Sequence, residues 1–291
     1  MEFPVVVGVD GSDSSLRALD WAVGESLRLG LPLRLVYASL WERYEGAVPS
    51  LDIERSSEQG LADHITASAV ERVRRQAPEV ELTSVVRPEE AMAALLEEAH
   101  EASVIVVGSR GRGGIAGLLL GSVSLSVAGR SHCPVVVVRR TEAPPATTPH
   151  RVVLGVGDAV ESGKATRFAF RDAEARKCGL VAVRAWRCPA RQQPDTPLLM
   201  DGPSLVHRQR AADVLNDALA ALERRHPQVD VRRETVEGPA HHVLIKAAAD
   251  ADLLVVGARR RTGRGGLQLG RINHAVLHHA PCPVAIVPER I

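Results

Sequence analysis

The sequence is poor in aromatic side chains: Phe, Trp and Tyr together make up 3% of its 291 residues. Surfaces that bind single-stranded nucleic acid use such side chains to stack against the bases. The charge balance is also nearly even, with 36 Lys and Arg, 35 Asp and Glu and a formal net charge of +1. Binding to nucleic acid or anionic lipid through charge requires a clear basic excess. We therefore expect neither nucleic acid nor a membrane to be a partner.

Long apolar runs and paired cysteines are also missing. No stretch approaches the roughly 18 consecutive apolar residues of a transmembrane helix. The N-terminal MEFPVVVGVDGS enters a strand-like run without the basic segment of a signal peptide. The four cysteines, Cys133, Cys178, Cys188 and Cys282, show no C-x-x-C spacing. These features predict a cytoplasmic protein with reduced thiols and no bound metal.

What the sequence does contain is one unit present twice. The segment PVVVGVDGSDSSLRALDWA corresponds to RVVLGVGDAVESGKATRFA, so that Gly8 matches Gly155 and Ala18 matches Ala165 without a gap. Near the ends of the two copies, VIVVGSRG matches LLVVGARR, and HCPVVVV matches PCPVAIV. A period this long indicates a duplicated domain rather than a solenoid.

A proline- and threonine-rich segment, RTEAPPATTPH, separates the two copies. It lacks apolar periodicity, which is typical of a linker. We expect a first domain at residues 1–140, a linker at 141–149 and a second domain at 150–291.

Each half alternates short apolar runs with longer stretches that carry apolar residues at helical spacing. Such alternation indicates parallel strands joined by right-handed helical crossovers. The predicted fold class is α/β, with two tandem doubly wound five-stranded parallel sheets. Strands are expected at residues 5–9, 33–38, 80–86, 104–107 and 135–138, and at 152–156, 180–185, 229–234, 253–256 and 284–287.

Three helices of the first half are expected at residues 14–29, 58–76 and 89–101, with residues 39–57 between them irregular. Apolar residues at helical spacing in the first two should face the core. They are Leu16, Leu19, Val23 and Leu27, followed by Leu61, Ile65, Ala69 and Val73.

A glycine-dense segment follows the apolar run at 104–107 and precedes a predicted helix. Its spacing is Gly108, two residues, Gly111, nine residues, Gly121 and then Ser122. Glycine permits positive φ and close approach of the main chain to a ligand. The first turn of a helix presents unpaired N–H groups and a partly positive dipole end, a combination that favours phosphate. Arg110 and Arg112 add positive charge.

This spacing resembles the nucleotide loop of the universal stress protein family, in which the pattern is Gly, two residues, Gly, nine residues, Gly and then Ser or Thr. The whole chain resembles a tandem universal stress protein. The resemblance implies an adenine nucleotide alpha hydrolase-like fold and an ATP site, with or without Mg²⁺, in the first domain. It also implies a nucleotide-dependent sensor or regulator of a stress or dormancy response rather than an enzyme.

The resemblance further implies roles for individual residues. Asp10, after the first strand, matches a family carboxylate that contacts ribose, and a backbone group at Ala38 or Tyr37 matches the one that reads adenine. Asp10 has an alternative role as a cap of the following helix. The implied nucleotide-binding residues are Val9, Asp10, Ala38, Gly108, Arg110, Gly111, Gly121, Ser122, Val123 and Ser124.

The second half departs from this pattern. Gly157 stands at the position of Asp10, Arg260 at that of Gly111, and Arg271 at that of Ser122. A long side chain at a close-approach position hinders a backbone cradle, so we expect weak or absent nucleotide binding there. The alternative is direct phosphate binding by the arginines of this loop, which are Arg259, Arg260, Arg261, Arg264 and Arg271.

Two other functions stay open from the sequence. One is a slow ATPase or phosphoryl-transfer enzyme, for which we identify no catalytic residue. The other is a ligand-free adaptor that uses the fold only to dimerise. For assembly, the apolar terminal strands at 135–138 and 284–287 need covering, so we expect them to pair within the chain and a homodimer to form.

Overall fold

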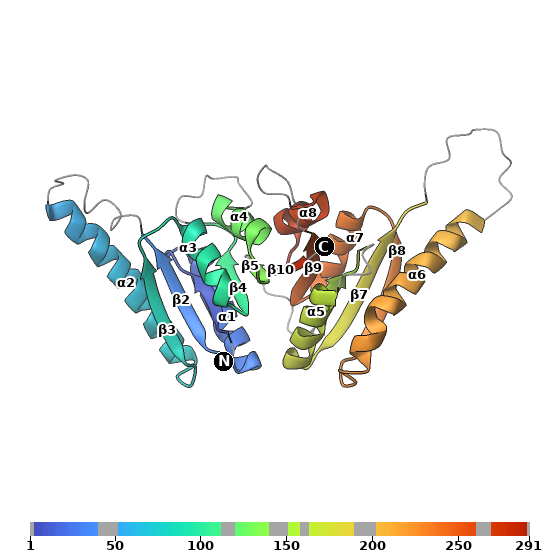
Figure 1. The fold of residues 1–291 in the computed structure, drawn as a ribbon, viewed down its shortest axis with the longest axis horizontal. Coiled ribbons are helices and arrows are strands. Elements are labelled where there is room, and N and C mark those ends of the chain that lie inside the picture. The colour runs from blue at the N-terminus through green and yellow to red at the C-terminus, as the bar shows by residue number, and fades with distance from the viewer. Residues whose placement is uncertain are drawn as a thin grey trace. The chain divides into compact units, whose positions relative to one another are not determined.

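The computed structural model describes residues 3–39, 52–111, 120–139, 151–157, 163–188, 202–259 and 269–289. The chain divides into two compact units, one containing strands β1 to β5 and the other β6 to β10 (Figure 1). Each unit is described by itself below.

The described part of the first unit is a parallel sheet of order β3-β2-β1-β4-β5 with helices on both faces. Strand β1 pairs with both β2 and β4, so the strand order reverses at β1. Its elements are β1 (Val5–Gly8), α1 (Asp13–Leu29), β2 (Leu33–Ala38), α2 (Asp52–Gln76), β3 (Leu82–Arg87), α3 (Ala91–Glu98), the 3₁₀ turn η2 (Ala99–Glu101), β4 (Val104–Gly108), α4 (Ser122–Arg130) and β5 (Val135–Val138).

The described part of the second unit repeats this topology, with strand order β8-β7-β6-β9-β10 and parallel pairing throughout. Its elements are β6 (Arg151–Gly155), α5 (Gly163–Arg176), β7 (Gly179–Trp186), α6 (Gly202–Glu223), β8 (Val231–Glu237), α7 (Ala240–Ala247), the 3₁₀ turn η3 (Ala248–Asp250), β9 (Leu253–Arg259), α8 (Arg271–His279) and β10 (Val284–Glu289). The predicted fold class, two tandem α/β domains with parallel sheets, is confirmed.

The core of each unit lies where the central strands meet the helices. Val5, Val6 and Val7 of β1 and Val104 of β4 have no exposed surface, because both sheet faces are covered. Helices α1 and α2 pack on each other, as do α3 and α4. The switch in strand order at β1 leaves a crevice at the carboxyl ends of the strands, which is where ligands bind in open α/β sheets.

Helix α1 has strong end signals. The Ser12 hydroxyl accepts a hydrogen bond from the backbone N–H of Ser15 at 3.2 Å and so caps the first turn. At the other end, Gly30 adopts a left-handed φ of 65° that a residue with a Cβ disfavours. These signals position the β1–α1 turn at one wall of the crevice.

The prediction that Leu27 and Leu61 face the core is wrong, because Leu27 is 42% exposed and Leu61 is 37% exposed. In α1 the residues nearest the sheet include Ala22 and Ser26, whose small side chains allow close approach and leave Leu27 at the rim. In α2, Ala62 takes the buried position instead of Leu61.

Several predicted boundaries also need correction. Helix α2 begins at Asp52, so the end of the stretch predicted to be irregular is helical. Strands β3 and β8 begin two residues later than predicted, because the turns before them contain Val80 and Val229, whose apolar side chains resemble strand residues. Each of these strands is at the edge of its unit's described sheet, where apolar patterning is weaker.

All four cysteines are free thiols. Burial raises the pKa of the Cys133 thiol, and it raises that of Cys178 to about 11. Thiols of this kind are poor nucleophiles at neutral pH.

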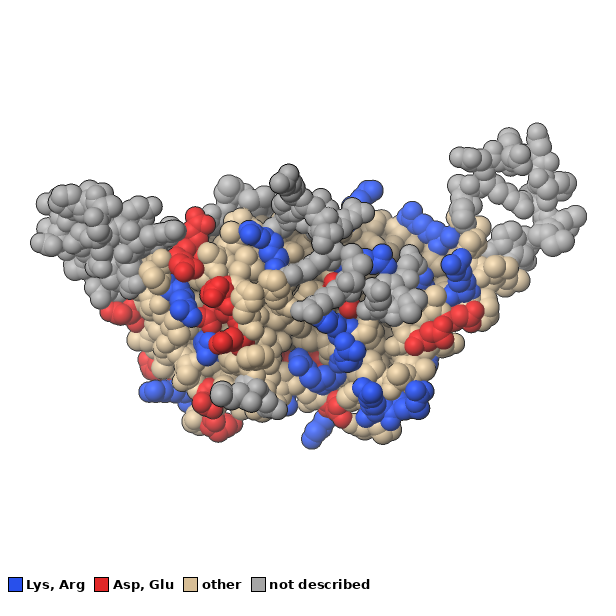
Figure 2. Space-filling view, viewed as in Figure 1, with Lys and Arg blue, Asp and Glu red and all other residues tan. Residues whose placement is uncertain are grey.

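On the face shown in Figure 2, Lys and Arg side chains form separate small groups rather than one continuous field.

Candidate functional site

A cavity of about 610 Å³ lies at the carboxyl ends of β1, β2 and β4 in the first unit. All ten residues predicted to bind nucleotide line it, which are Val9, Asp10, Ala38, Gly108, Arg110, Gly111, Gly121, Ser122, Val123 and Ser124. Its volume is in the range of ordinary small-molecule sites. The structure therefore brings residues from four separate sequence segments to one place.

The amino end of α4 opens into this cavity. Gly121 is the N-cap, has extended backbone and has no side chain to cap the helix. Its own N–H donates to the Ser109 carbonyl at 2.7 Å, and the first intrahelical bond runs from Leu125 N–H to the Gly121 carbonyl. The amides of Ser122, Val123 and Ser124 precede that bond and so have no partner within the helix. Three donors and the positive end of the helix dipole thus face a cavity, the arrangement that anions favour.

The glycines of the loop do not need positive φ, which was one of the two properties the sequence suggested for them. Among the described glycines, positive φ occurs at Gly11, Gly30 and Gly238 but not at Gly108, Gly111 or Gly121. A Cβ on Gly108 would lie 2.6 Å from the backbone oxygen of Ser14, so this glycine lets β4 pack against α1. A Cβ on Gly111 would lie 2.8 Å from Oδ2 of Asp10. The close approaches are therefore to the protein's own main chain and carboxylate.

Asp10 serves the turn between β1 and α1. Its Oδ1 accepts hydrogen bonds from the Ser12 N–H at 3.0 Å and the Ser12 hydroxyl at 2.6 Å. This is the local role that the sequence left open as an alternative. The same bonds orient the carboxylate, with Oδ2 on the side of Gly111 and the side chain among those that line the cavity. The side chain thus has a structural role in the turn and a place in the cavity wall.

Ala38 presents its backbone to the cavity. Along β2 successive peptide groups face alternate neighbours: the Val36 carbonyl accepts from Val9 N–H at 2.9 Å, whereas Ser39 N–H donates to Arg87 of β3. By this alternation the N–H and C=O of Ala38 face the side of β1, beyond its last residue Gly8. A donor and an acceptor therefore lie side by side at the cavity wall.

Ser122 and Ser124, the two serines of α4 predicted to bind nucleotide, differ in their surroundings. Ser124 is buried, and its hydroxyl donates to the Gly108 carbonyl at 2.6 Å, which fastens α4 to the end of β4. Asn273 does the same in the second unit, where its side-chain amide donates to Gly257 at 3.0 Å. Ser122 is exposed at the start of the helix. A structural bond thus explains the side chain of Ser124, a role the prediction missed.

Arg110 of the loop lines the cavity. Arg110 has an exposed side chain, and its N–H donates to the Ser14 hydroxyl at 3.2 Å. Arg112 lies outside the described residues.

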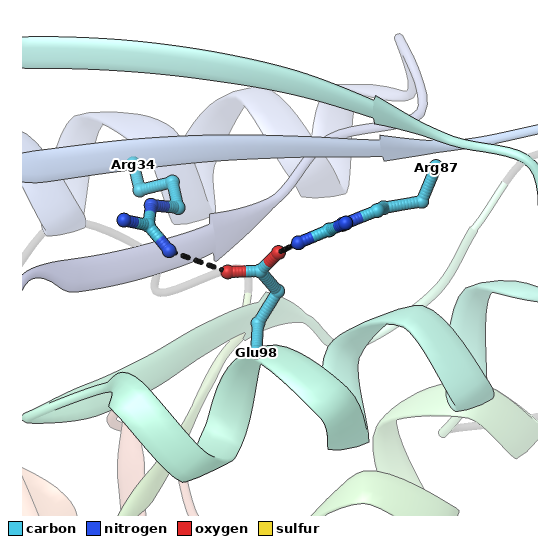
Figure 3. A network of polar contacts seen from close by, with 3 residues as sticks. All are labelled: Arg34, Arg87 and Glu98. Atoms are coloured by element: carbon cyan, nitrogen blue, oxygen red, sulfur yellow. Dashed lines mark hydrogen bonds and ion pairs between the residues drawn. The ribbon is translucent and has the colours of Figure 1, made fainter.

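The far wall of the cavity comes from α3, which the site prediction missed. Ala91 and Leu95 line the cavity, and Glu98 follows on the same helical face. Glu98 is 3% exposed and accepts hydrogen bonds from Arg34 of β2 at 2.8 Å and from Arg87 of β3 at 2.9 Å (Figure 3). Burial raises the pKa of Glu98, but the two arginines outweigh it and hold the pKa below its usual value. This network ties α3 to the sheet.

The corresponding cavity of the second unit measures about 200 Å³, a third of the first. Gly8 pairs with Val36 in the first unit and Gly155 with Val183 in the second, so Tyr37 corresponds to Arg184. Arg184 is buried and lines this smaller cavity. Of the arginines named from the sequence, either as obstacles to a backbone cradle or as direct phosphate ligands, Arg259 and Arg271 are exposed, whereas Arg260, Arg261 and Arg264 lie outside the described residues.

The described residues provide neither a metal-binding cluster nor a membrane-spanning helix. The described residues contain no group of three or more His, Cys, Asp or Glu placed to hold a metal ion. His274 and His278, one turn apart on α8, stack on each other with ring centroids 4.4 Å apart. Across the described segments, no helix has the length and apolarity that a membrane span requires.

Comparison with known proteins matches the universal stress protein family model twice, at residues 2–139 and 149–288. Universal stress protein Rv2005c of Mycobacterium tuberculosis is 32% identical over 297 residues, covering 98% of this chain and 97% of the relative. Universal stress protein Rv2623 of the same organism is 29% identical, covering 99% and 97%. A solved universal stress protein of Archaeoglobus fulgidus shares the fold, with a TM-score of 0.68, 17% identity and 98% of both chains covered. The chain therefore belongs to the universal stress protein family.

Proposed function

We propose that the first unit binds ATP, with or without Mg²⁺, and that the protein is a cytoplasmic, nucleotide-dependent regulator in a stress or dormancy response. The observation that carries the proposal is the uncapped first turn of α4, which directs three amides into a cavity of nucleotide size. We assign this function to the domain at residues 1–140 and regard 141–149 as a linker to the domain at 150–291.

The three parts of a nucleotide correspond to three parts of the cavity. Phosphates are placed at the amides of Ser122, Val123 and Ser124, where the helix dipole favours negative charge. The Asp10 carboxylate, which lies at the cavity wall, accepts ribose hydroxyls. The edge of the adenine ring hydrogen-bonds to the N–H and C=O of Ala38. The faces of the adenine ring contact the apolar wall that includes Leu95.

The cavity offers binding groups rather than a catalytic set. Among the described residues that line it, Asp10 is the one carboxylate, and its Oδ1 is engaged by Ser12. Hydrolysis would need a base placed to orient a water molecule. We therefore propose a sensor, in which nucleotide occupancy is the signal, and not an enzyme.

The decisive experiment replaces Gly121 with aspartate. Gly121 has φ −78° and ψ 154°, which aspartate adopts readily, and a Cβ there meets nothing closer than 3.5 Å. The new carboxylate caps α4 and occupies the amides that ATP needs. We expect ATP affinity by calorimetry to fall about a hundredfold, since each charge-assisted bond contributes about 1.5 kcal/mol or more and 1.4 kcal/mol is a factor of ten.

The matched control is Gly270→Asp, the same change at the N-cap of α8 in the second unit, where a Cβ meets no atom within 4 Å. It should leave ATP affinity unchanged. Equal affinity of the wild type and Gly121→Asp would refute the site. A wild-type protein that binds no ATP would leave the ligand-free adaptor as the better description.

For assembly, we propose that the terminal strands β5 and β10 pair with each other within the chain and that the tandem chain forms a homodimer. The support is physical: Val135–Val138 and Val284–Val287 are apolar strands at the ends of their own units' sheets. Uncovered strands of this kind would invite aggregation.

A further inference from the structure

The second unit's cavity contains a buried arginine, Arg184, where the first unit has Tyr37. Arg184 is 8% exposed and lies next to the last strand position that pairs with β6. Its Nη1 donates to the Gly157 carbonyl at 2.6 Å and to the Val156 carbonyl at 3.3 Å. The side chain therefore reaches from the end of β7 to the end of β6.

The Arg184 side chain thus crosses the position that corresponds to the proposed nucleotide site of the first unit. In the first unit the ends of β1 and β2 hold Asp10 and Ala38 on either side of the cavity. Their counterparts in the second unit are Gly157 and Ala185, and both line the smaller cavity together with Arg184. The guanidinium thus lies against the residue that replaces Asp10.

The guanidinium is held firmly. Hydrogen bonds from a charged donor to carbonyls are stronger than neutral ones, and burial strengthens them further. Glu289, the buried carboxylate of the same cavity, accepts hydrogen bonds from Ala165 N–H at 2.8 Å and Lys164 N–H at 3.4 Å at the start of α5. A ligand would have to displace the side chain from its two carbonyls.

We propose that Arg184 is the residue that excludes nucleotide from the second unit, so that one chain carries one nucleotide site. This inference rests on the proposed function of the first unit. It differs from the sequence-based explanation, which attributed the loss to arginines in the β9–α8 loop.

The test creates a second site rather than removing the first. Arg184→Tyr introduces the residue found at the corresponding position, where Tyr37 is 9% exposed and lines a cavity three times as large. The variant is made in the Gly121→Asp background, so that any ATP bound reports on the second unit. Arg184→Ala is made in parallel in case tyrosine does not pack. Arg187→Tyr, an exposed arginine three residues further along the chain, is the matched control.

We expect calorimetry to show ATP binding at one per chain for a folded Arg184 variant, at least tenfold tighter than for the Gly121→Asp parent. The Arg187→Tyr control should resemble the parent. Photolabelling with an azido-ATP probe should mark peptides of the second unit only in the Arg184 variants. Circular dichroism and thermal melting establish which variants are folded.

If both Arg184 variants fold and bind no better than the parent, the inference is wrong. It is also wrong if the wild-type chain binds two ATP molecules, although the first site would then stand. If the wild type binds none but an Arg184 variant binds one, the proposed function of the first unit fails while the role of Arg184 holds.

Discussion

Asp10 has a structural role in the β1–α1 turn, and we propose that it also binds the nucleotide. Its Oδ1 accepts two hydrogen bonds from Ser12, and its other oxygen lies on the side of Gly111. A substitution that removes the whole carboxylate would change both roles together. A useful variant has to separate them.

Asp10→Asn makes this separation. The amide oxygen can still accept from Ser12, so we expect the free energy of unfolding in urea to change by less than about 0.5 kcal/mol, as for a substitution that breaks no interaction. ATP affinity should fall about tenfold, because one charged acceptor of a ribose hydroxyl is lost. Asp10→Ala should lose both stability and affinity. If Asp10→Asn binds ATP as tightly as the wild type, Asp10 is only a turn residue.

The glycine spacing was predictable at the residue scale, but its cause was not. Gly108, Gly111 and Gly121 follow a buried strand and precede a helix, and this order placed the cavity correctly. The contacts that require two of these glycines involve Ser14 and Asp10, which lie about a hundred residues earlier in the chain. Local patterns do not report such distant neighbours.

Arg184 illustrates the same limit. In the sequence it is one polar residue at the end of an apolar run. Its hydrogen bonds to the carbonyls of Val156 and Gly157, just after β6, follow only from the register of β6 with β7.

At the scale of elements, the position of α3 determines the shape of the first cavity. Arg34 and Arg87 come from adjacent strands and meet Glu98 from opposite sides (Figure 3). The sequence predicted the helix from its apolar residues, but it held no sign that a buried glutamate joins it to two arginines. The second unit has Ala247 at the position matching Glu98, so this ion-pair network is specific to the first unit.

Glu98→Gln should weaken the attachment of α3 to the sheet. The substitution removes the buried carboxylate, so Arg34 and Arg87 lose their charged partner. Their side chains are 27% and 40% exposed, so water compensates them in part. We expect a loss of about 1–3 kcal/mol in the free energy of unfolding at pH 7, together with weaker ATP binding. Lys246→Gln on the exposed side of α7 is a control for changes of surface charge. An unchanged urea midpoint would show that the network adds no stability.

The same variant has a predicted pH signature. The folded-state pKa of Glu98 is lowered, so its stabilising effect is fully present above the unfolded value of about 4.3 and is lost as pH falls through the lower folded value. The difference in unfolding free energy between wild type and Glu98→Gln should therefore be constant from pH 7 to about pH 5 and shrink below pH 4. A difference that grows on acidification would contradict the assigned pKa direction.

At the scale of the whole molecule, duplication gives the chain two units of one topology with different cavities. The strand order and the crevice are retained in both. The cavities differ at side chains of the strand ends, among them Asp10 against Gly157 and Tyr37 against Arg184. One topology can therefore carry two different cavities.

The assembly proposal can be tested at single amides, because the register determines which way each one points. In β5, Ile105 N–H donates to the Pro134 carbonyl and Ser109 N–H to that of Val138, so by alternation Val136 faces β4. The amides of Val135 and Val137 therefore face away from β4. If terminal strands pair, hydrogen exchange at these two amides should be as slow as at Val136, the internal reference.

The corresponding amides of β10 are those of Val284 and Ile286, since Leu254 N–H donates to Pro283. Position 288, the next outward-facing one, is a proline without an N–H, so a pairing partner gains no donor there. We expect slow exchange at Val284 and Ile286 by NMR, and light scattering should give twice the chain mass of 31.2 kDa. Fast hydrogen exchange at the outward-facing amides of β5 and β10 would show that neither strand is paired at that edge, which would contradict the proposal. A single-chain mass with slow exchange would retain pairing within the chain and exclude the homodimer.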